Sequence, residues 1–199
     1  MLIIRQANKD DAKEILAVYT PYITNTAITF ETEVPSIMEF ENRIDSILCK
    51  YPYFVVEDES SIIGYVYASA FHERNAYRYN VDWSIYLKKE YHGKHLGSLL
   101  FNLLVEVLKK QGFLKIFSLV TSDNKGSIAL HNALHFRITG IWEKVGYKFN
   151  SWYDVHLFEF TMEEKEIPQE ITWFSSFPKE QLDTILKKYN ILLQEEYKS

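Results

Sequence analysis

The spacing of apolar residues divides the chain into segments with a helical period and segments typical of strands. Helical patterns occupy residues 8–23, 36–50, 96–112 and 124–134. Strand patterns, rich in β-branched and aromatic residues, occupy residues 2–7, 53–58, 61–71, 77–87, 113–122, 136–149 and 152–162. The predicted order is therefore β-α-α-β-β-β-α-β-α-β-β, which indicates an α/β (α+β) fold.

The strand predicted at residues 77–87 alternates most clearly. Its side chains should face two sides, with Val81, Trp83 and Ile85 on one and Asp82, Ser84 and Tyr86 on the other. Asp82 is thus a carboxylate inside a sheet, and such groups tend to have shifted pKa values. This makes Asp82 a candidate for proton transfer. The alternatives are that Asp82 caps a turn or pairs with Arg78 or His72.

The character of the chain changes at about residue 163, where the charged stretch "EEKEIPQE" begins. A helix is predicted after it, with Pro178 in the first turn. Its apolar face would consist of Leu182, Ile185, Leu186 and Tyr189. We therefore divide the chain into a domain at 1–162 and an extension at 163–199. The extension helix either docks on the domain or serves as a dimer element.

Composition and charge narrow the class of protein. The 199 residues suit one domain with an appendage, and the net charge of -5 argues against a broad nucleic-acid-binding surface. The single Cys49 excludes an intramolecular disulfide and a multi-cysteine metal site. No apolar run reaches the roughly 18 residues of a membrane span, and the N-terminus lacks the pattern of a signal peptide. We therefore expect a soluble cytoplasmic protein without membrane partners.

The stretch "EYHGKHLGSLL" at residues 90–100 joins a predicted strand to a predicted helix through a glycine-containing turn. Unpaired N–H groups and the helix dipole make such a turn suitable for an anion. Gly93 and Gly97 flank Lys94 and His95, but neither GxxxxGK[ST] nor GxGxxG is present. The alternative is an ordinary helix start with surface charges.

Within this turn, "HGKHLG" is similar to the Q/R-x-x-G-x-G/A motif of the GNAT superfamily of acyl-CoA N-acyltransferases, which binds the CoA pyrophosphate. His92 stands in the Gln/Arg place, His95 in the first glycine place and Gly97 in the second. The stretches "YTPYITNTAITFE", "AYRYNVDWSIYL", "SDNKGSIALHNALHF" and "VGYKFNSWYDV" resemble the phosphinothricin and methionine sulfoximine acetyltransferase branch, across residues 2–161.

The resemblance implies a GNAT fold, with a mixed, mostly antiparallel sheet of about seven strands flanked by helices. It also implies acetyl-CoA as cosubstrate and an amino acid or an analogue as acceptor. The implied cofactor-binding residues are Ile85, Tyr86, Leu87, His92, Gly93, Lys94, His95, Leu96, Gly97, Ser98, Asn124 and Ser127. Asn124 could instead be only a helix cap. We expect His95 to have a negative φ, so that its side chain is tolerated, while Gly93 and Gly97 supply backbone freedom.

For catalysis, the resemblance places Asp82 where the family usually has a Glu that acts as base. Asp is one methylene shorter, so a bridging water is an option. His131 lies seven residues after Asn124, where many members place a Tyr that protonates the thiolate. A structural role is the alternative for His131.

The resemblance also implies a substrate pocket formed by Phe30, Glu31, Asn75, Ala76, Tyr77 and Arg78. Arg78 would clamp a substrate carboxylate, or else form a surface or dimer ion pair. The stretch "VGYKFNSWYD" resembles the homodimer segment, with Lys148 and Trp152 near the partner's pocket. His135 takes a second family glycine place, and no ligand spacing suggests a metal.

Two other functions remain open. One is acetylation of a polyamine or of a protein N-terminus, although Arg78 favours an acceptor with a carboxylate. The other is a degenerate acyltransferase that binds CoA, or nothing, and serves as an interaction module. The two glycine-to-histidine differences and the extension at 163–199 motivate this second alternative.

Overall fold

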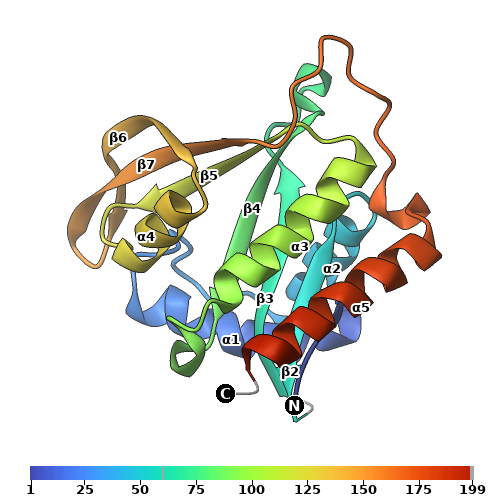
Figure 1. The fold of residues 1–199 in the computed structure, drawn as a ribbon. Coiled ribbons are helices and arrows are strands. Elements are labelled where there is room, and N and C mark those ends of the chain that lie inside the picture. The colour runs from blue at the N-terminus through green and yellow to red at the C-terminus, as the bar shows by residue number, and fades with distance from the viewer. Residues whose placement is uncertain (60, 198–199) are drawn as a thin grey trace.

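A computed structural model of the chain describes residues 1–59 and 61–197, and it contains one seven-stranded sheet in the order β1-β2-β3-β4-β5-β7-β6 (Figure 1). The strands are β1 (Leu2–Gln6), β2 (Tyr53–Asp58), β3 (Ser61–Ala70), β4 (Asn80–Leu87), β5 (Lys115–Thr121), β6 (Arg137–Lys148) and β7 (Ser151–Thr161). All neighbours are antiparallel except β4 and β5, which are parallel. The predicted fold is therefore confirmed.

The main helices are α1 (Ala12–Asn25), α2 (Ile37–Leu48), α3 (Leu96–Gln111), α4 (Lys125–Ala133) and α5 (Lys179–Glu196). Single 3-10 turns form η1 (Lys9–Asp11), η2 (Asn75–Tyr77), η3 (Lys89–Tyr91) and η4 (Phe174–Ser176). Figure 1 shows α3 and α5 side by side on one face of the sheet, with α1 and α2 on the other. The predicted helices thus cover both faces.

Strand alternation produces a separate core on each face. On β4, Val81 and Trp83 join the core under α3 and α5, whereas Tyr86 packs against the core under α1 and α2. Tyr53 and Tyr65 from β2 and β3 are also buried under α1, where their rings stack 5.7 Å apart. The predicted faces of β4 are confirmed, and burial on both sides explains its largely apolar sequence.

The extension helix α5 docks on its own chain, against β1 and α3. Its buried residues are Leu182, Ile185, Tyr189 and Leu193, and Leu186 packs beside them. Asn190 exchanges two hydrogen bonds with the backbone of Ile4, at 2.7 and 2.8 Å. β1 is an edge strand, and these bonds pair the N–H and C=O of Ile4 that no neighbouring strand pairs. Helix α5 therefore buries apolar surface and also provides hydrogen-bond partners for the backbone of the edge strand. Residues 198–199 of the predicted extension lie outside the described residues.

The docking of α5 predicts a sharp contrast between two adjacent leucines. Leu193 is fully buried, whereas Leu192 is 39% exposed. We expect Leu193→Ala to lower the free energy of unfolding by about 2–5 kcal/mol, because it leaves a cavity in the core. Leu192→Ala, the matched control, should change it by only about 0.5 kcal/mol. Urea denaturation measures both, and equal effects would contradict docking of α5.

Candidate functional site

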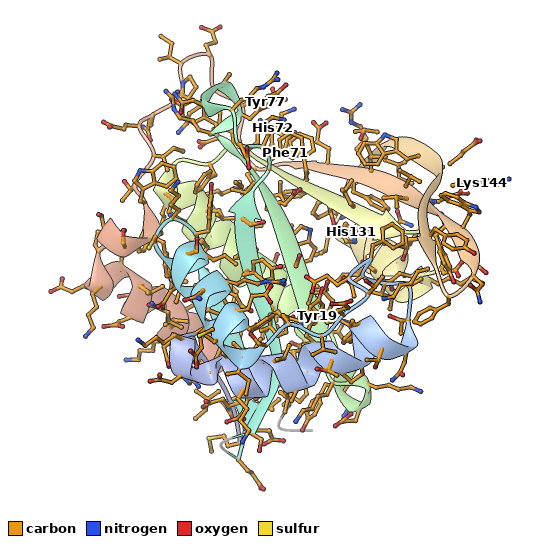
Figure 2. The ribbon with its side chains drawn as sticks, turned by 180° about the vertical axis from the view of Figure 1, so that it is seen from behind. Tyr19, Phe71, His72, Tyr77, His131 and Lys144 are labelled. Carbon is orange, nitrogen blue, oxygen red and sulfur yellow. The ribbon has the colours of Figure 1, made fainter. Side chains whose placement is uncertain are left out.

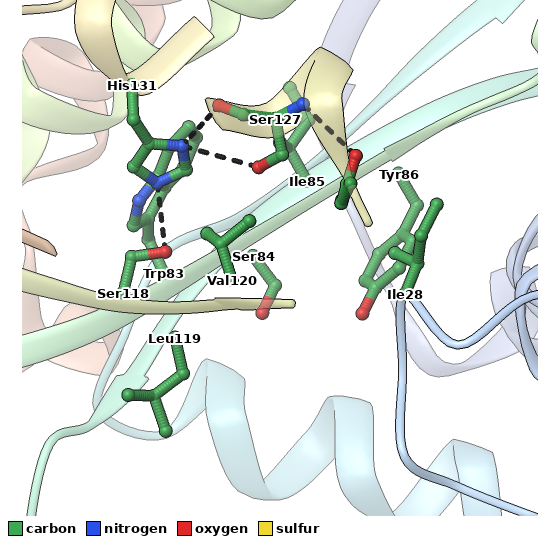
Figure 3. Close-up of a pocket in the computed structure, with 11 residues that line it drawn as sticks. Ile28, Trp83, Ser84, Ile85, Tyr86, Ser118, Leu119, Val120, Ser127 and His131 are labelled. Carbon is green, nitrogen blue, oxygen red and sulfur yellow. Dashed lines mark hydrogen bonds between the residues drawn. The ribbon is translucent and has the colours of Figure 1, made fainter. Parts of the chain in front are cut away.

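The sheet opens at its centre, between β4 and β5. These strands pair only from Asn80 to Asp82 and from Lys115 to Phe117, and they part beyond those residues. A cavity of about 60 Å³ fills the gap (Figure 3). Its lining is Ile28, Trp83, Ser84, Ile85, Tyr86, Ser118, Leu119, Val120, Asn124, Ser127 and His131. Backbone of β4 that would pair with a neighbouring strand is therefore free to meet a ligand.

Asp82 lies at the closed end of this gap, in the last residue pair between β4 and β5. Burial raises the pKa of its carboxyl to about 7. Its Oδ1 has no hydrogen-bond partner in the described part of the chain. Arg78 instead contacts the hydroxyl of Tyr79 at 2.8 Å, and Nδ1 of His72 accepts from the Arg74 N–H at 3.1 Å. The Asp82 carboxyl thus titrates near neutral pH, although it lines neither of the two cavities.

His131 is buried at the wall of the gap, between two serines (Figure 3). Its Nδ1 lies 2.7 Å from the Ser127 carbonyl, which can only accept, so Nδ1 carries the proton. Its Nε2 lies 2.9 Å from the Ser118 hydroxyl and must then accept from it. Burial lowers the pKa of the imidazole to about 4. His131 is therefore neutral at pH 7, and Ser118 is directly linked to it.

Ser118 is a site residue that sequence reasoning missed. It is buried in β5, and its hydroxyl joins the polar side chains of Asn124, Ser127 and His131 in the lining of the gap. The available signal was a hydroxyl residue inside the otherwise apolar run "IFSLV". A buried serine of this kind needs a hydrogen-bond partner, and His131 supplies it.

A larger cleft of about 430 Å³ continues from the gap toward the start of α3. The two cavities share Ile28, Ile85, Asn124 and Ser127 in their linings. Residues lining the cleft include Ile85, Leu87, His92, Gly93, Lys94, His95, Leu96, Gly97, Ser98, Asn124 and Ser127. The structure thus brings the predicted cofactor residues together in this cleft, except Tyr86, which lines the gap. Asn124 also caps α4 by accepting from the Ser127 N–H at 3.1 Å.

The expected conformation of His95 is wrong. His95 has φ 57°, in the left-handed region, where a side chain costs about 1–2 kcal/mol relative to glycine. Gly93 also has a positive φ of 72°, as expected for a glycine that supplies backbone freedom. Gly97 differs, because an added Cβ there would lie 3.2 Å from the Leu130 side chain. Its role is close packing of α3 against α4.

His135, the second histidine in a family glycine place, also has a positive φ, 62°. It follows the end of α4, where a left-handed residue commonly terminates a helix. The His135 N–H donates to Asn132 and the Phe136 N–H donates to His131, which satisfies the final carbonyls. His135 lines neither cavity, so this difference concerns the helix end and not the cleft.

His92 connects the turn to the end of β4. Its Nε2 lies 3.0 Å from both the Leu87 carbonyl and the Tyr22 hydroxyl. Tyr22 in turn donates to the same Leu87 carbonyl. Sequence reasoning missed Tyr22, and its only signal was its place on the apolar face of the first predicted helix. These contacts hold the turn at a fixed distance from the strand that carries Asp82.

The predicted substrate residues lie in two separate places. Phe30 packs near Tyr153, and Glu31 pairs with Arg43 at 2.7 Å. Asn75, Ala76 and Tyr77 form η2, and Arg78 follows it. Figure 2 shows Tyr77 with Phe71 and His72 at one end of the molecule, away from His131. None of the predicted substrate residues lines the gap or the cleft.

Lys148 is buried and contacts its own chain. Its Nζ donates to the Thr29 carbonyl at 2.8 Å, which ties the loop after α1 to the end of β6. Desolvation lowers the pKa of this amine. Trp152 is 59% exposed on β7 and lies beside Tyr147, with 5.1 Å between the ring centres. Of the two residues expected near a partner, only Trp152 is available at the surface.

Two other kinds of feature are absent from the described residues. No group of three or more His, Cys, Asp or Glu side chains there could hold a metal ion. None of the helices within residues 1–59 and 61–197 has the length and apolar character needed to cross a membrane.

Comparisons with known proteins agree with this geometry. The acetyltransferase (GNAT) domain family matches residues 4–157. The chain is 30% identical to phosphinothricin N-acetyltransferase of Streptomyces viridochromogenes, over 76% of this chain and 83% of that one. It is 32% identical to the L-methionine sulfoximine/L-methionine sulfone acetyltransferase of Pseudomonas aeruginosa, over 80% and 94%. A phosphinothricin acetyltransferase from Sinorhizobium meliloti, solved with acetyl-CoA, superposes with a TM-score of 0.81 and 34% identity, over 87% and 98%.

The left-handed backbone of His95 leads to a prediction about stability. We expect His95→Gly to raise the free energy of unfolding by about 1 kcal/mol, because glycine adopts positive φ without a steric penalty. His92→Gly is a matched control, since the φ of His92 is -70° and its ring makes two contacts. The control should lose stability in the same urea titration. A loss of stability in both variants would show that the conformation of His95 carries no strain.

Proposed function

Because the chain belongs to the GNAT family of acetyltransferases, we propose that it acetylates the primary amine of an amino acid or a similar compound. The family makes the chain an acetyl-CoA-dependent N-acetyltransferase. The proposed acceptor class is that of its relatives, phosphinothricin and methionine sulfoximine. The observation that carries the proposal is the gap between β4 and β5, which joins the cleft at the start of α3 and ends at Asp82.

The cleft suits acetyl-CoA in its chemistry. The N-terminus of α3 and the side chain of Lys94 provide positive charge for the pyrophosphate. The backbone of Ile85, Tyr86 and Leu87 lies where the pantetheine arm would extend toward the gap. When bound, acetyl-CoA supplies the acetyl thioester. We place that thioester in the gap, where unpaired N–H groups of β4 can stabilise the oxyanion.

Asp82 is our candidate for the base. Its carboxylate would accept a proton from the substrate ammonium, and the free amine would then attack the thioester carbonyl. Since Asp82 does not line the gap itself, a bridging water between Asp82 and the amine fits the geometry better than direct contact. Its Oδ1 is buried without a hydrogen-bond partner among the described residues, and that water would supply one.

Ser118 and His131 are candidates for the second proton transfer. The attacking nitrogen must lose one more proton, and the departing CoA thiolate must gain one. The Ser118 oxygen can accept the proton from nitrogen while its own hydroxyl proton moves to Nε2 of neutral His131. The reverse transfer, from Nε2 back to Ser118 and from the Ser118 hydroxyl to sulfur, then protonates the thiolate. The predicted acid role of His131 therefore stays a prediction, with Ser118 standing between the imidazole and the gap.

Two assignments about assembly and location follow the family resemblance. We propose a homodimer that forms through an apolar face on β6, β7 and the turn between them. This β6–β7 face consists of the exposed residues Ile138, Ile141, Trp142, Val145, Tyr147, Phe149 and Trp152. So many exposed large apolar side chains within one hairpin are typical of an interaction site. We also propose that the enzyme works in the cytoplasm.

The proposed function is tested by release of free thiol from acetyl-CoA. The panel contains amino acids, their sulfoximine and phosphinate analogues, polyamines and peptide N-termini. We expect turnover with amino-acid-like amines, whereas turnover with polyamines or peptides alone would redirect the acceptor class. Thermal stabilisation by acetyl-CoA without turnover would indicate a binding module. Ligand at 100 times Kd adds about 2.7 kcal/mol of stability.

The role of Asp82 predicts a specific kinetic defect. Asp82→Asn should lower kcat by about 100-fold or more, because it removes a general base without changing the shape of the site. The Kd for acetyl-CoA, measured by calorimetry, should stay within about twofold. Asp82→Glu, which restores the family residue, should retain most of the activity. An Asn variant with parental turnover would remove Asp82 from the mechanism.

The raised pKa of Asp82 also predicts the pH dependence of the parent enzyme. Below pH 7 the carboxyl of the free enzyme is mostly protonated and cannot accept a proton, so kcat/KM should rise with pH through about 7. This rise should be absent from the residual activity of Asp82→Asn. A parental profile that is flat between pH 6 and 8 would contradict the assignment.

The proposed dimer predicts a change of mass. Trp152→Asp should convert the protein to a monomer, because it places a charge within the β6–β7 face. Ile167→Asp is the matched control, since Ile167 is also exposed but lies in the connector before α5. Sedimentation velocity measures both variants. A Trp152→Asp variant with the parental mass would contradict this interface.

A further inference from the structure

The C-terminal extension touches the cofactor turn directly. The hydroxyl of Tyr197 donates a hydrogen bond to the Lys94 carbonyl, with 2.9 Å between the oxygens. Tyr197 follows the last residue of α5, which lies beyond the segment 4–157 that matches the family. The turn of this chain therefore has a hydrogen-bond partner outside the family segment.

The bonded carbonyl belongs to the peptide that precedes His95. In a planar trans peptide, the C=O and the following N–H point in opposite directions. The hydrogen bond from Tyr197 to the Lys94 oxygen therefore also orients the N–H of His95 away from α5. The orientation of this peptide plane sets the φ of His95, which is the strained left-handed value of 57°. Both Lys94 and His95 line the cleft.

Each side of this contact is itself held in place. The Tyr197 N–H donates to the Leu193 carbonyl at 3.1 Å, and Leu193 is fully buried. On the side of the turn, the Lys94 ammonium lies over the Tyr91 ring, 5.3 Å from its centre. The Tyr91 hydroxyl donates to Asp58 at 2.9 Å. Tyr197 is thus a fixed donor at the end of a docked helix and not a loose terminal side chain.

We propose that Tyr197 is a positioning residue for acetyl-CoA binding. Its hydrogen bond holds the peptide between Lys94 and His95 in the conformation that aims the His95 N–H into the cleft. This compensates for a histidine at a position where the family has glycine. The inference rests on the proposed binding of the acetyl-CoA pyrophosphate by this turn. Tyr197 touches neither substrate, so it acts on affinity and not on the chemical step.

The test compares two substitutions that each remove one hydroxyl from the extension. Tyr197→Phe removes the bond to the turn. Tyr189→Phe is the matched control, because its hydroxyl faces Glu106 on α3, away from the cleft. We expect Tyr197→Phe to raise the Kd for acetyl-CoA about three- to tenfold, the effect of one hydrogen bond, with kcat at saturation unchanged. The control should bind acetyl-CoA within about twofold of the parent.

A double-substitution cycle tests the compensation itself. In a His95→Gly background, glycine adopts the left-handed conformation without the steric cost, so Tyr197→Phe should change Kd less than about twofold. Acetyl-pantetheine, which lacks the pyrophosphate, supplies a second readout. Its KM should be the same in the parent and in Tyr197→Phe.

The outcomes separate this inference from the proposed function. A parent protein that fails to bind acetyl-CoA would refute the proposed function before any variant is compared. A parent that binds, together with Tyr197→Phe at the parental Kd, would overturn the role of Tyr197. So would an equal rise of Kd in the parental and His95→Gly backgrounds, or an equal rise of KM for acetyl-pantetheine.

Discussion

The parting of β4 and β5 is the constraint on which the rest of the site depends. Each strand keeps a full-length antiparallel partner on its other side, β3 for β4 and β7 for β5. The sheet therefore tolerates a central gap without losing either strand. The gap exposes backbone polar groups at the middle of a domain, where such groups normally pair. A ligand arm that can hydrogen-bond like a strand is the natural occupant of this gap.

Burial beside the gap moves two titratable groups in opposite directions. Desolvation disfavours the charged form of each, so it raises the pKa of Asp82 to about 7 and lowers that of His131 to about 4. One cause thus provides a carboxylate that is close to its titration point and an imidazole that is neutral. The apolar packing of β4 and β5 thus sets the protonation state of both groups near neutral pH.

Features that repeat locally along the chain could be predicted from the sequence, and so could features that the family resemblance implies. Alternation along β4 placed Asp82 and Trp83 on opposite faces, and the resemblance brought the cofactor residues into one cleft. The left-handed conformation of His95 was not predictable from a helical pattern, because that pattern carries no information about φ at the residue before the helix, nor about the contact of the preceding Lys94 carbonyl with Tyr197, 103 residues away. Ser118 was missed for a similar reason, since its role appears only when α4 places His131 against β5.

The two histidines with positive φ near the ends of helices show two ways to accommodate an unfavourable backbone. At His135, the compensation is local, because hydrogen bonds between neighbouring residues close the end of α4. At His95, the hydrogen-bond partner of the preceding peptide comes from the end of α5, where Tyr197 donates to the Lys94 carbonyl. The stability of α5 on β1 and α3 is therefore connected to the geometry of the turn. If α5 undocks, the Lys94 carbonyl loses its hydrogen bond from Tyr197, so in this chain the extension and the turn before α3 form one physical unit.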